Sequence, residues 1–103
     1  MQSSTFPAIW FTIELIAYNY PNKPCSADKK KYRRFFESLG DVLPCKYCRD
    51  NYKENLIISN FSDQIFCCRD TLTRWVYDLH NQVNHNLGKP SYKTYEEVRD
   101  YYE

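Results

Sequence analysis

The feature that most constrains the fold is a long segment in the second half of the chain, from about Asp63 to Leu87, with apolar residues at helical spacing. These residues recur every three or four positions and so share one face of a helix: Leu72, Val76, Leu79 and Val83. Gly88 follows the segment and Pro90 comes two residues later, an order typical of the residues just past the C-terminus of a helix. The segment therefore predicts a long amphipathic helix with the spacing of a helical bundle.

Four more helices are predicted, which makes the expected fold all-α, a four-helix bundle with a short fifth helix. Their expected ranges are about Pro7–Tyr20, Ser26–Val42, Cys45–Leu56 and a short helix after Thr94. The first is apolar on nearly every side and should be central, with Ser4 or Thr5 as its N-cap. Ser26 is the expected N-cap of the second. Only two glycines are present, which argues against a fold with many β-turns.

Length and charge exclude several classes of protein. The 103 residues suffice for one domain with a core but not two, so residues 1–103 are expected to form a single domain. The formal charge of +1 gives no electrostatic reason to expect nucleic acid as a partner. The apolar run from Phe6 to Ala17 contains Glu14 and is too short for a membrane span. The first five residues lack the basic region of a secretory signal, which suggests the cytoplasm or an organelle reached by another route.

Two cysteines lie three positions apart at the predicted start of the third helix, directly after a proline. Pro44 is tolerated there, because an N–H group in a first helical turn has no partner to lose. Unpaired N–H groups and the positive end of the helix dipole favour the thiolate forms of Cys45 and Cys48. The spacing suits a reversible disulfide and also half of a zinc site.

A polar stretch from Trp75 to Pro90 is the second informative region. On a helix, His80 and Asn84 lie on one face, so imidazole and amide groups there could hydrogen-bond a planar heterocycle or a ribose. Lys89, just past the predicted helix end, could meet a phosphate. Taken alone, the stretch is also typical of an exposed polar helix face.

Taken together, the two stretches resemble the Erv/ALR family of FAD-dependent sulfhydryl oxidases. The resemblance rests on Pro-Cys-x-x-Cys at a helix start, followed by Trp-x-x-x-x-His-Asn-x-Val-Asn-x-x-Leu-Gly-Lys-Pro. An early tryptophan, Trp10, and the Tyr20-Pro21 pair also fit, and the likeness extends from about Phe6 to Tyr102. It implies a helical bundle that holds FAD beside the cysteine pair.

The resemblance also implies roles for individual residues. Cys48 would lie against the flavin and Cys45 would be the sulfur that a substrate thiolate attacks. The positions that match FAD contacts of the family are Trp10, His80, Asn81, Val83, Asn84, Leu87 and Lys89, with Tyr101 or Tyr102 as a late aromatic. The implied reaction oxidises a protein dithiol, passes electrons to FAD and then to O2, and gives hydrogen peroxide.

Further expectations concern partners and location. The family implies a homodimer formed through the first two helices, and substrates that reach Cys45 directly or through a thioredoxin-like carrier. Many cellular members have a structural disulfide whose two positions are Ile57 and Tyr77 here, so this chain lacks it. Short viral members lack it too. A viral chain would act in the host cytoplasm or the virion, whereas the mitochondrial intermembrane space is the alternative.

Glu14 departs from the family pattern, since a histidine usually stands four residues after the early tryptophan. A carboxylate in an apolar helix needs a partner or a proton. Two interpretations stay open: Glu14 contacts FAD, or it is a core carboxyl paired with an arginine or a tyrosine.

The competing hypothesis is a structural metal site. A structural zinc module could use Cys45, Cys48, either Cys67 or Cys68, and His80. Against it, a core with this many aromatic residues does not need a metal to fold.

Three further outcomes stay open for the extra thiols. Cys67 and Cys68 could be ordinary buried thiols, form a redox pair, or bridge to Cys25 if the Cα atoms approach within roughly 7 Å.

Overall fold

The computed structural model describes residues 6–90 and 93–103, and within these ranges the chain forms helices and no strand. The elements are, in order, α1 (Phe6–Tyr18), α2 (Ser26–Val42), α3 (Lys46–Ile58), the short 3-10 helix η2 (Asp63–Cys67), α4 (Arg69–Asn86) and α5 (Tyr95–Tyr102). The all-α prediction is therefore confirmed. Across the described ranges, every helix is too short or too polar to cross a bilayer.

The longest predicted helix is divided in two. One continuous helix from Asp63 was the wrong prediction, because Cys68 adopts an extended backbone (φ −161°, ψ 175°) between η2 and α4. The Cys68 N–H donates to Oγ1 of Thr71 (3.2 Å), so α4 has its own N-terminal cap. At the other end, Gly88 has a φ of 72°, which confirms the predicted helix end.

The start of α2 also differs from the prediction. Cys25, and not Ser26, is the N-cap residue, and its backbone N–H donates to a carboxylate oxygen of Asp28 (3.0 Å). The caps expected for the first helix, Ser4 and Thr5, lie outside the described residues.

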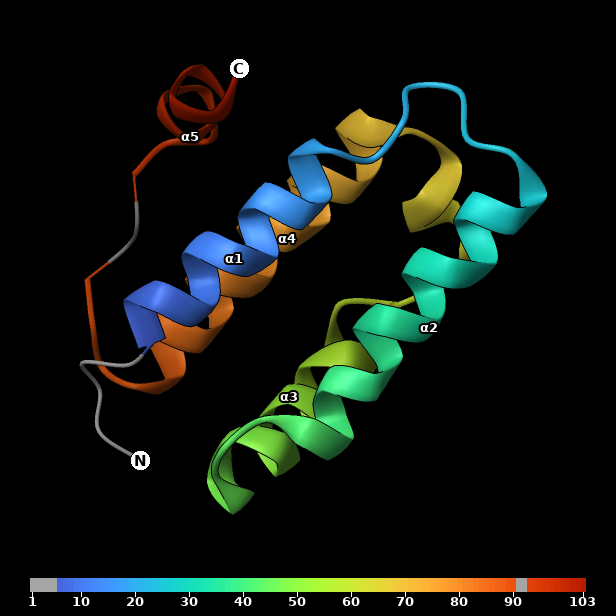
Figure 1. Ribbon diagram of the computed structural model, residues 1–103. Coiled ribbons are helices and arrows are strands. Elements are labelled where there is room, and N and C mark those ends of the chain that lie inside the picture. The colour runs from blue at the N-terminus through green and yellow to red at the C-terminus, as the bar shows by residue number, and fades with distance from the viewer. Residues whose placement is uncertain (1–5, 91–92) are drawn as a thin grey trace.

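Two helix pairs make up the bundle, with α1 alongside α4 and α2 alongside α3 (Figure 1). The short helix η2 packs between α4 and α2. The last helix, α5, lies outside the four longer ones, where Tyr102 stacks on Tyr18 of α1 with ring centroids 5.1 Å apart. This placement brings the C-terminal residues to the side of α1.

Aromatic side chains form the centre of the core. The rings of Phe36 and Trp75 meet edge to face at 5.7 Å, and Phe61 and Phe66 pack around them. The indole N–H of Trp75 donates to Oγ of Ser59 (3.0 Å), so its polar atom is satisfied inside the core. Truncating such a buried ring costs about 3–5 kcal/mol.

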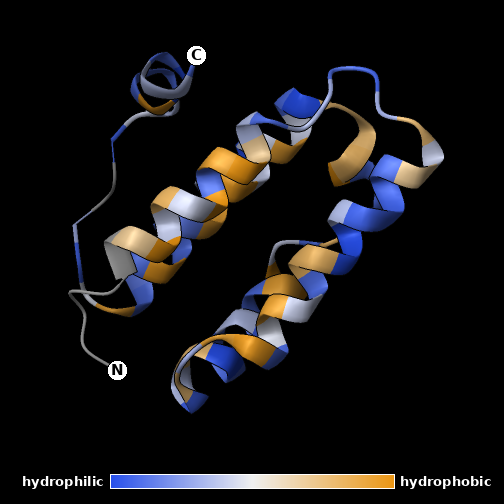
Figure 2. Cartoon of the chain, in the orientation of Figure 1, coloured by the Kyte–Doolittle hydropathy of each residue, from blue (hydrophilic) through white to orange (hydrophobic). Residues whose placement is uncertain are grey.

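The first helix is apolar around much of its circumference (Figure 2). Its inner face is buried through Ile13 and Ala17, whereas Phe11 and Leu15 on other faces stay exposed. The prediction that this helix is central therefore holds for its inner face, whereas its other faces are exposed in a single chain.

Candidate active site

The Cys45 and Cys48 side chains form a disulfide at the N-terminus of α3, with their Cα atoms 5.2 Å apart. Cys45 is the N-cap residue, and the backbone N–H of Cys48 donates to its sulfur (3.1 Å). Both cysteines are half-buried. The two sulfurs are therefore joined to each other at a helix N-terminus, as the redox interpretation predicted.

The connection before the disulfide is fixed by the chain itself. Leu43 ends α2 in an extended conformation, and Pro44 has no N–H group to satisfy. The guanidinium of Arg49 donates to the Leu43 carbonyl (2.7 Å) and ties α3 back to the end of α2. The cysteine pair is thus held at a tight corner between two helices.

A small cavity of about 60 Å³ lies against the disulfide. Residues from all four longer helices and from the corner between α2 and α3 line it: Ile9, Trp10, Ile13, Leu39, Leu43, Pro44, Tyr47, Cys48, Asn51, Tyr52, Val83 and Leu87. Most of this lining is apolar or aromatic, and Cys48 lines it whereas Cys45 does not. One sulfur of the disulfide therefore borders a space suited to a flat apolar group, and the other lies outside it.

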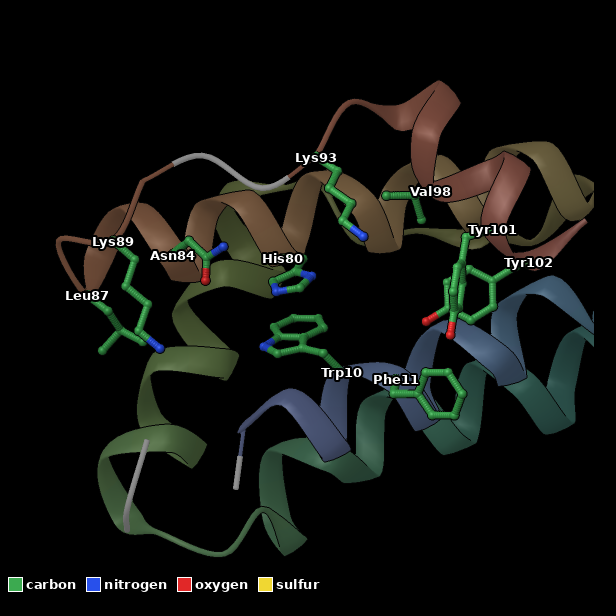
Figure 3. A pocket seen from close by; sticks show the side chains of 10 residues that line it. All are labelled: Trp10, Phe11, His80, Asn84, Leu87, Lys89, Lys93, Val98, Tyr101 and Tyr102. Carbon is green, nitrogen blue, oxygen red and sulfur yellow. The ribbon is translucent and has the colours of Figure 1, made fainter. Parts of the chain in front are cut away.

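A second cavity, of about 320 Å³, opens between α1, α4 and α5 (Figure 3). Its lining residues are Trp10, Phe11, His80, Asn84, Leu87, Lys89, Lys93, Val98, Tyr101 and Tyr102. Trp10 and Leu87 line both cavities, so the two adjoin one another. Together they offer an apolar chamber at the disulfide and a wider, more polar one leading from it.

Trp10 and His80 form a flat stack in the wall of the larger cavity, with ring centroids 4.1 Å apart and planes inclined by 7° (Figure 3). Behind this stack, Nδ1 of His80 donates to Oε1 of Glu14 (3.0 Å). Glu14 is only 2% exposed and His80 only 7%. The pairing gives one oxygen of the buried carboxyl a partner and fixes the orientation of the imidazole, whereas the other oxygen, Oε2, is buried with no hydrogen bond from the described residues.

Two lysines supply positive charge at the larger cavity. The N–H groups of Gly88 and Lys89 donate to the carbonyls of His85 (3.0 Å) and Asn84 (2.8 Å), which turns the chain at the end of α4. The hydroxyl of Tyr77 donates to the carbonyl of Lys93 (2.6 Å) and so holds the backbone of that residue. Among the described residues that line the cavity there is no acidic side chain, which favours an anionic group as its ligand.

Tyr52 forms part of the wall of the smaller cavity and stays neutral. Burial is the main reason that its pKa is raised above the usual range of a tyrosine. Its hydroxyl donates to the carbonyl of Phe36, so the residue contributes packing and a helix-to-helix bond.

Comparison with known proteins adds to this geometry. Residues 7–103 match the sequence model of the Erv1/Alr family. The chain belongs to this family. The resemblance inferred from the sequence is therefore confirmed.

Similar proteins occur in viruses and in cellular organisms. A probable FAD-linked sulfhydryl oxidase of Acanthamoeba polyphaga mimivirus is 39% identical over 80 residues, covering 78% of this chain and 56% of that protein. An FAD-linked sulfhydryl oxidase of Arabidopsis thaliana is 32% identical over 82 residues, covering 80% of this chain and 41% of that one. The chain thus spans about half the length of these relatives.

The fold matches the crystal structure of the yeast Erv1 core, with a TM-score of 0.87 and 21% identity. The match covers 100% of this chain and 85% of that one.

The structure gathers most of the residues that the Erv/ALR resemblance singled out. Those at the two cavities are Trp10, Cys48, His80, Val83, Asn84, Leu87 and Lys89, and both candidates for the late aromatic, Tyr101 and Tyr102. Asn81 and Glu14 line neither cavity. Glu14 pairs with His80. The prediction that its partner would be an arginine or a tyrosine was therefore wrong.

Sequence reasoning missed several lining residues, among them Phe11, Lys93, Tyr47 and Asn51. Asn51 carried a usable signal, since it lies one helical turn after Cys48 and shares its face of α3. Lys93 had none, because its place depends on how the segment after α4 turns back.

The zinc hypothesis finds no support in this Erv/ALR chain. Cys45 and Cys48 are bonded to each other, and nowhere in residues 6–90 and 93–103 do three or more His, Cys, Asp or Glu side chains group as metal ligands. Cys25, Cys67 and Cys68 are free thiols, so the expected alternative of a bridge to Cys25 is not formed. Of the alternatives left open, a buried thiol does not hold for Cys67, which is exposed, and Cys68 is half-buried.

Proposed function

We propose that this chain is a FAD-linked sulfhydryl oxidase in which residues 1–103 act as one domain and oxidise protein dithiols through the Cys45–Cys48 disulfide. The observation that carries the proposal is the asymmetry of the disulfide. Cys48 borders an apolar cavity that adjoins a lysine-bearing one, and Cys45 does not line it. Relatives named as FAD-linked sulfhydryl oxidases in a virus and a plant support the same assignment.

The two cavities fit the two ends of FAD. The apolar and aromatic chamber at Cys48 suits a flat ring system, and the wider cavity offers the Trp10–His80 stack for a second aromatic ring. Lys89 and Lys93 suit phosphate groups between them. FAD, when bound, supplies the two-electron chemistry that ends in the reduction of O2 to hydrogen peroxide.

The protein's own part is disulfide exchange. A substrate thiolate attacks the sulfur of Cys45, a mixed disulfide forms, and Cys48 leaves as a thiolate at the edge of the small cavity. The second substrate thiolate then attacks the substrate sulfur of the mixed disulfide, which releases Cys45 as a thiolate and the substrate as a disulfide. The N-terminal N–H groups of α3 stabilise both thiolates of the reduced pair.

The proposal includes partners and a location. Phe11 and Leu15 on α1 are exposed apolar residues on a helix that the family would use for a homodimer, so we expect a second copy of this chain there. The substrates are expected to be protein dithiols, delivered directly or by a thioredoxin-like carrier. Viral relatives favour the host cytoplasm or the virion as the location, and a mitochondrial relative in yeast keeps the intermembrane space as the alternative.

The test is an absorbance spectrum of the purified protein, followed by addition of dithiothreitol in air. We expect a flavin spectrum that bleaches and then recovers while oxygen is consumed. A variant at Cys25, a thiol on the surface at the start of α2, is the matched control and should behave like the unaltered chain. A folded, colourless protein that carries stoichiometric zinc would overturn the proposal.

A further inference from the structure

Four side-chain amides connect the polar end of α4 to the cavity at Cys48. Nε2 of Gln82 donates to Oδ1 of Asn86 (3.0 Å), and Nδ2 of Asn86 donates to Oδ1 of Asn55 (3.4 Å). Nδ2 of Asn55 in turn donates to Oδ1 of Asn51 (3.1 Å). The two middle amides, those of Asn86 and Asn55, each accept through the oxygen and donate through the nitrogen, so all three bonds point in one direction, from Gln82 toward Asn51.

The middle of this amide chain is buried. Asn55 is only 1% exposed, and its two side-chain hydrogen bonds use both the oxygen and the nitrogen of the amide, one to α4 and one within α3. Burying an amide without hydrogen-bond partners costs free energy, so an asparagine is tolerated at this buried position because both ends of its side chain are bonded. Hydrogen bonds in series also polarise one another, which strengthens the last donor of the series.

The last amide belongs to the cavity wall. Asn51 lines the small cavity together with Cys48 and lies one turn after it on α3. Its side-chain oxygen is already engaged by Asn55, so the group that it can offer to a ligand is the NH2 group. In a lining that is otherwise mostly apolar, this amide is placed to select the orientation of a flat ligand.

We infer that the amide chain holds Asn51 as a hydrogen-bond donor to a carbonyl oxygen or ring nitrogen of the aromatic group bound beside Cys48. The inference rests on the proposed function, in which the bound aromatic group is the flavin ring. Asn51 makes the contact, and Asn55, Asn86 and Gln82 are positioning residues that act through it. Such a donor orients the ring against the Cys48 sulfur and stabilises negative charge on the acceptor atom.

The decisive variant is Asn51→Asp, which keeps an oxygen for Asn55 to donate to and replaces the NH2 donor with a carboxylate oxygen. We expect the dissociation constant for FAD to rise roughly twofold to tenfold, the effect of one lost hydrogen bond. We also expect the visible absorption bands of bound flavin to shift, because a donor at the ring edge affects its electronic spectrum.

A second variant, Asn55→Leu, breaks the chain of bonds without touching the cavity. It should weaken FAD binding and shift the absorption bands in the same direction as Asn51→Asp, by a smaller amount. Asn19→Ala is the matched control, because Asn19, directly after α1, is an exposed amide whose nitrogen donates to the carbonyl of Leu15. Thermal unfolding of each apoprotein separates a binding effect from a loss of fold.

The inference requires both variants to change FAD binding and the flavin spectrum. If either leaves both quantities at the values of the unaltered chain, while that chain binds FAD and oxidises dithiothreitol, the inference is wrong and the proposed function stands. If the unaltered chain binds no FAD, the proposed function fails and the inference fails with it.

Discussion

Cys45 and Cys68 occupy the same position in their helices, since each is the N-cap residue, of α3 and of α4 respectively. Each also has a cysteine close by in the sequence, Cys48 three positions later and Cys67 directly before. The first pair is joined in a disulfide, whereas Cys67 and Cys68 are free. A helix N-terminus favours a thiolate in both places, so the environment that activates a thiol does not by itself make a redox pair.

Spacing and surroundings account for the difference. A three-residue separation at a helix start brings two Cα atoms to 5.2 Å, within the range that a disulfide needs. Cys48 also borders a cavity, and of Cys67 and Cys68 neither lines either of the two cavities described above. Under the proposed function, the space beside one sulfur is what distinguishes a redox pair from two thiols, and this difference can be tested from both sides.

The largest effect is expected for Cys48→Ser, which removes the sulfur that borders the cavity. Dithiol oxidation should fall to background because no disulfide can form with Cys45, whereas FAD should stay bound since the cavity lining is otherwise kept. Oxygen consumption with dithiothreitol measures the first quantity and the visible spectrum measures the second. Cys67→Ser is the control, and residual turnover by Cys48→Ser well above background would contradict the role given to that sulfur.

The next effect concerns the wall of the larger cavity. Glu14→Ala leaves the Nδ1–H of a buried histidine without its acceptor, which costs about 1–3 kcal/mol of folding stability. FAD affinity should fall about tenfold, because the Trp10–His80 stack loses the bond that orients it. Thermal unfolding and FAD titration measure the two effects.

Glu14→Gln is the matched variant for this test. Its amide oxygen can still accept from His80, so it should lose much less affinity than Glu14→Ala. Equal losses for the two variants would show that the hydrogen bond to His80 is not what the site requires.

A smaller effect tests the second cysteine pair. Hydrogen bonds from Thr71 lower the pKa of the Cys68 thiol, so a larger fraction of it is thiolate at any given pH. Thr71→Val removes the side-chain hydroxyl but keeps the backbone N–H, which is the larger cause of the lowered pKa, so it should raise the pKa of Cys68 only in part and slow its alkylation by iodoacetamide about twofold at neutral pH. The difference should shrink as the pH rises above the pKa of both forms.

Mass spectrometry of the alkylated peptide measures this rate, and Thr71→Ser, which keeps the hydroxyl, is the control. Identical labelling of the three proteins across the pH range would mean that the Thr71 hydroxyl has no influence on this thiol.

The features of the fold that the sequence predicts are those that depend on residues close together in the chain. The end of α4 was predictable, because a glycine with positive φ followed by a proline is a local signal. The break at Cys68 was not, since it accompanies the packing of Phe66 in the core against Tyr20 and Phe36, which are distant in the sequence.

The same reasoning applies to the site. The disulfide and the residues of α4 at the cavities were identified from motifs within single helices. The Glu14–His80 pair joins residues 66 positions apart, and the amide chain crosses from α4 to α3. Such contacts depend on which helices pack together, and no local spacing in the sequence specifies them.

The smallest expected effect is also the one that tests the comparison most directly. Combining Cys67→Ser with Cys68→Ser removes the second pair, and turnover with dithiothreitol should stay within about twofold, because neither residue lines the cavities or contacts the disulfide. A protein dithiol should be oxidised at an unchanged rate as well. If the small substrate were unaffected but the protein substrate slowed strongly, Cys67 and Cys68 would be a relay that delivers electrons to Cys45. The two cysteine pairs would then act one after the other in the same reaction. Their difference in spacing and surroundings would reflect the order in which they act.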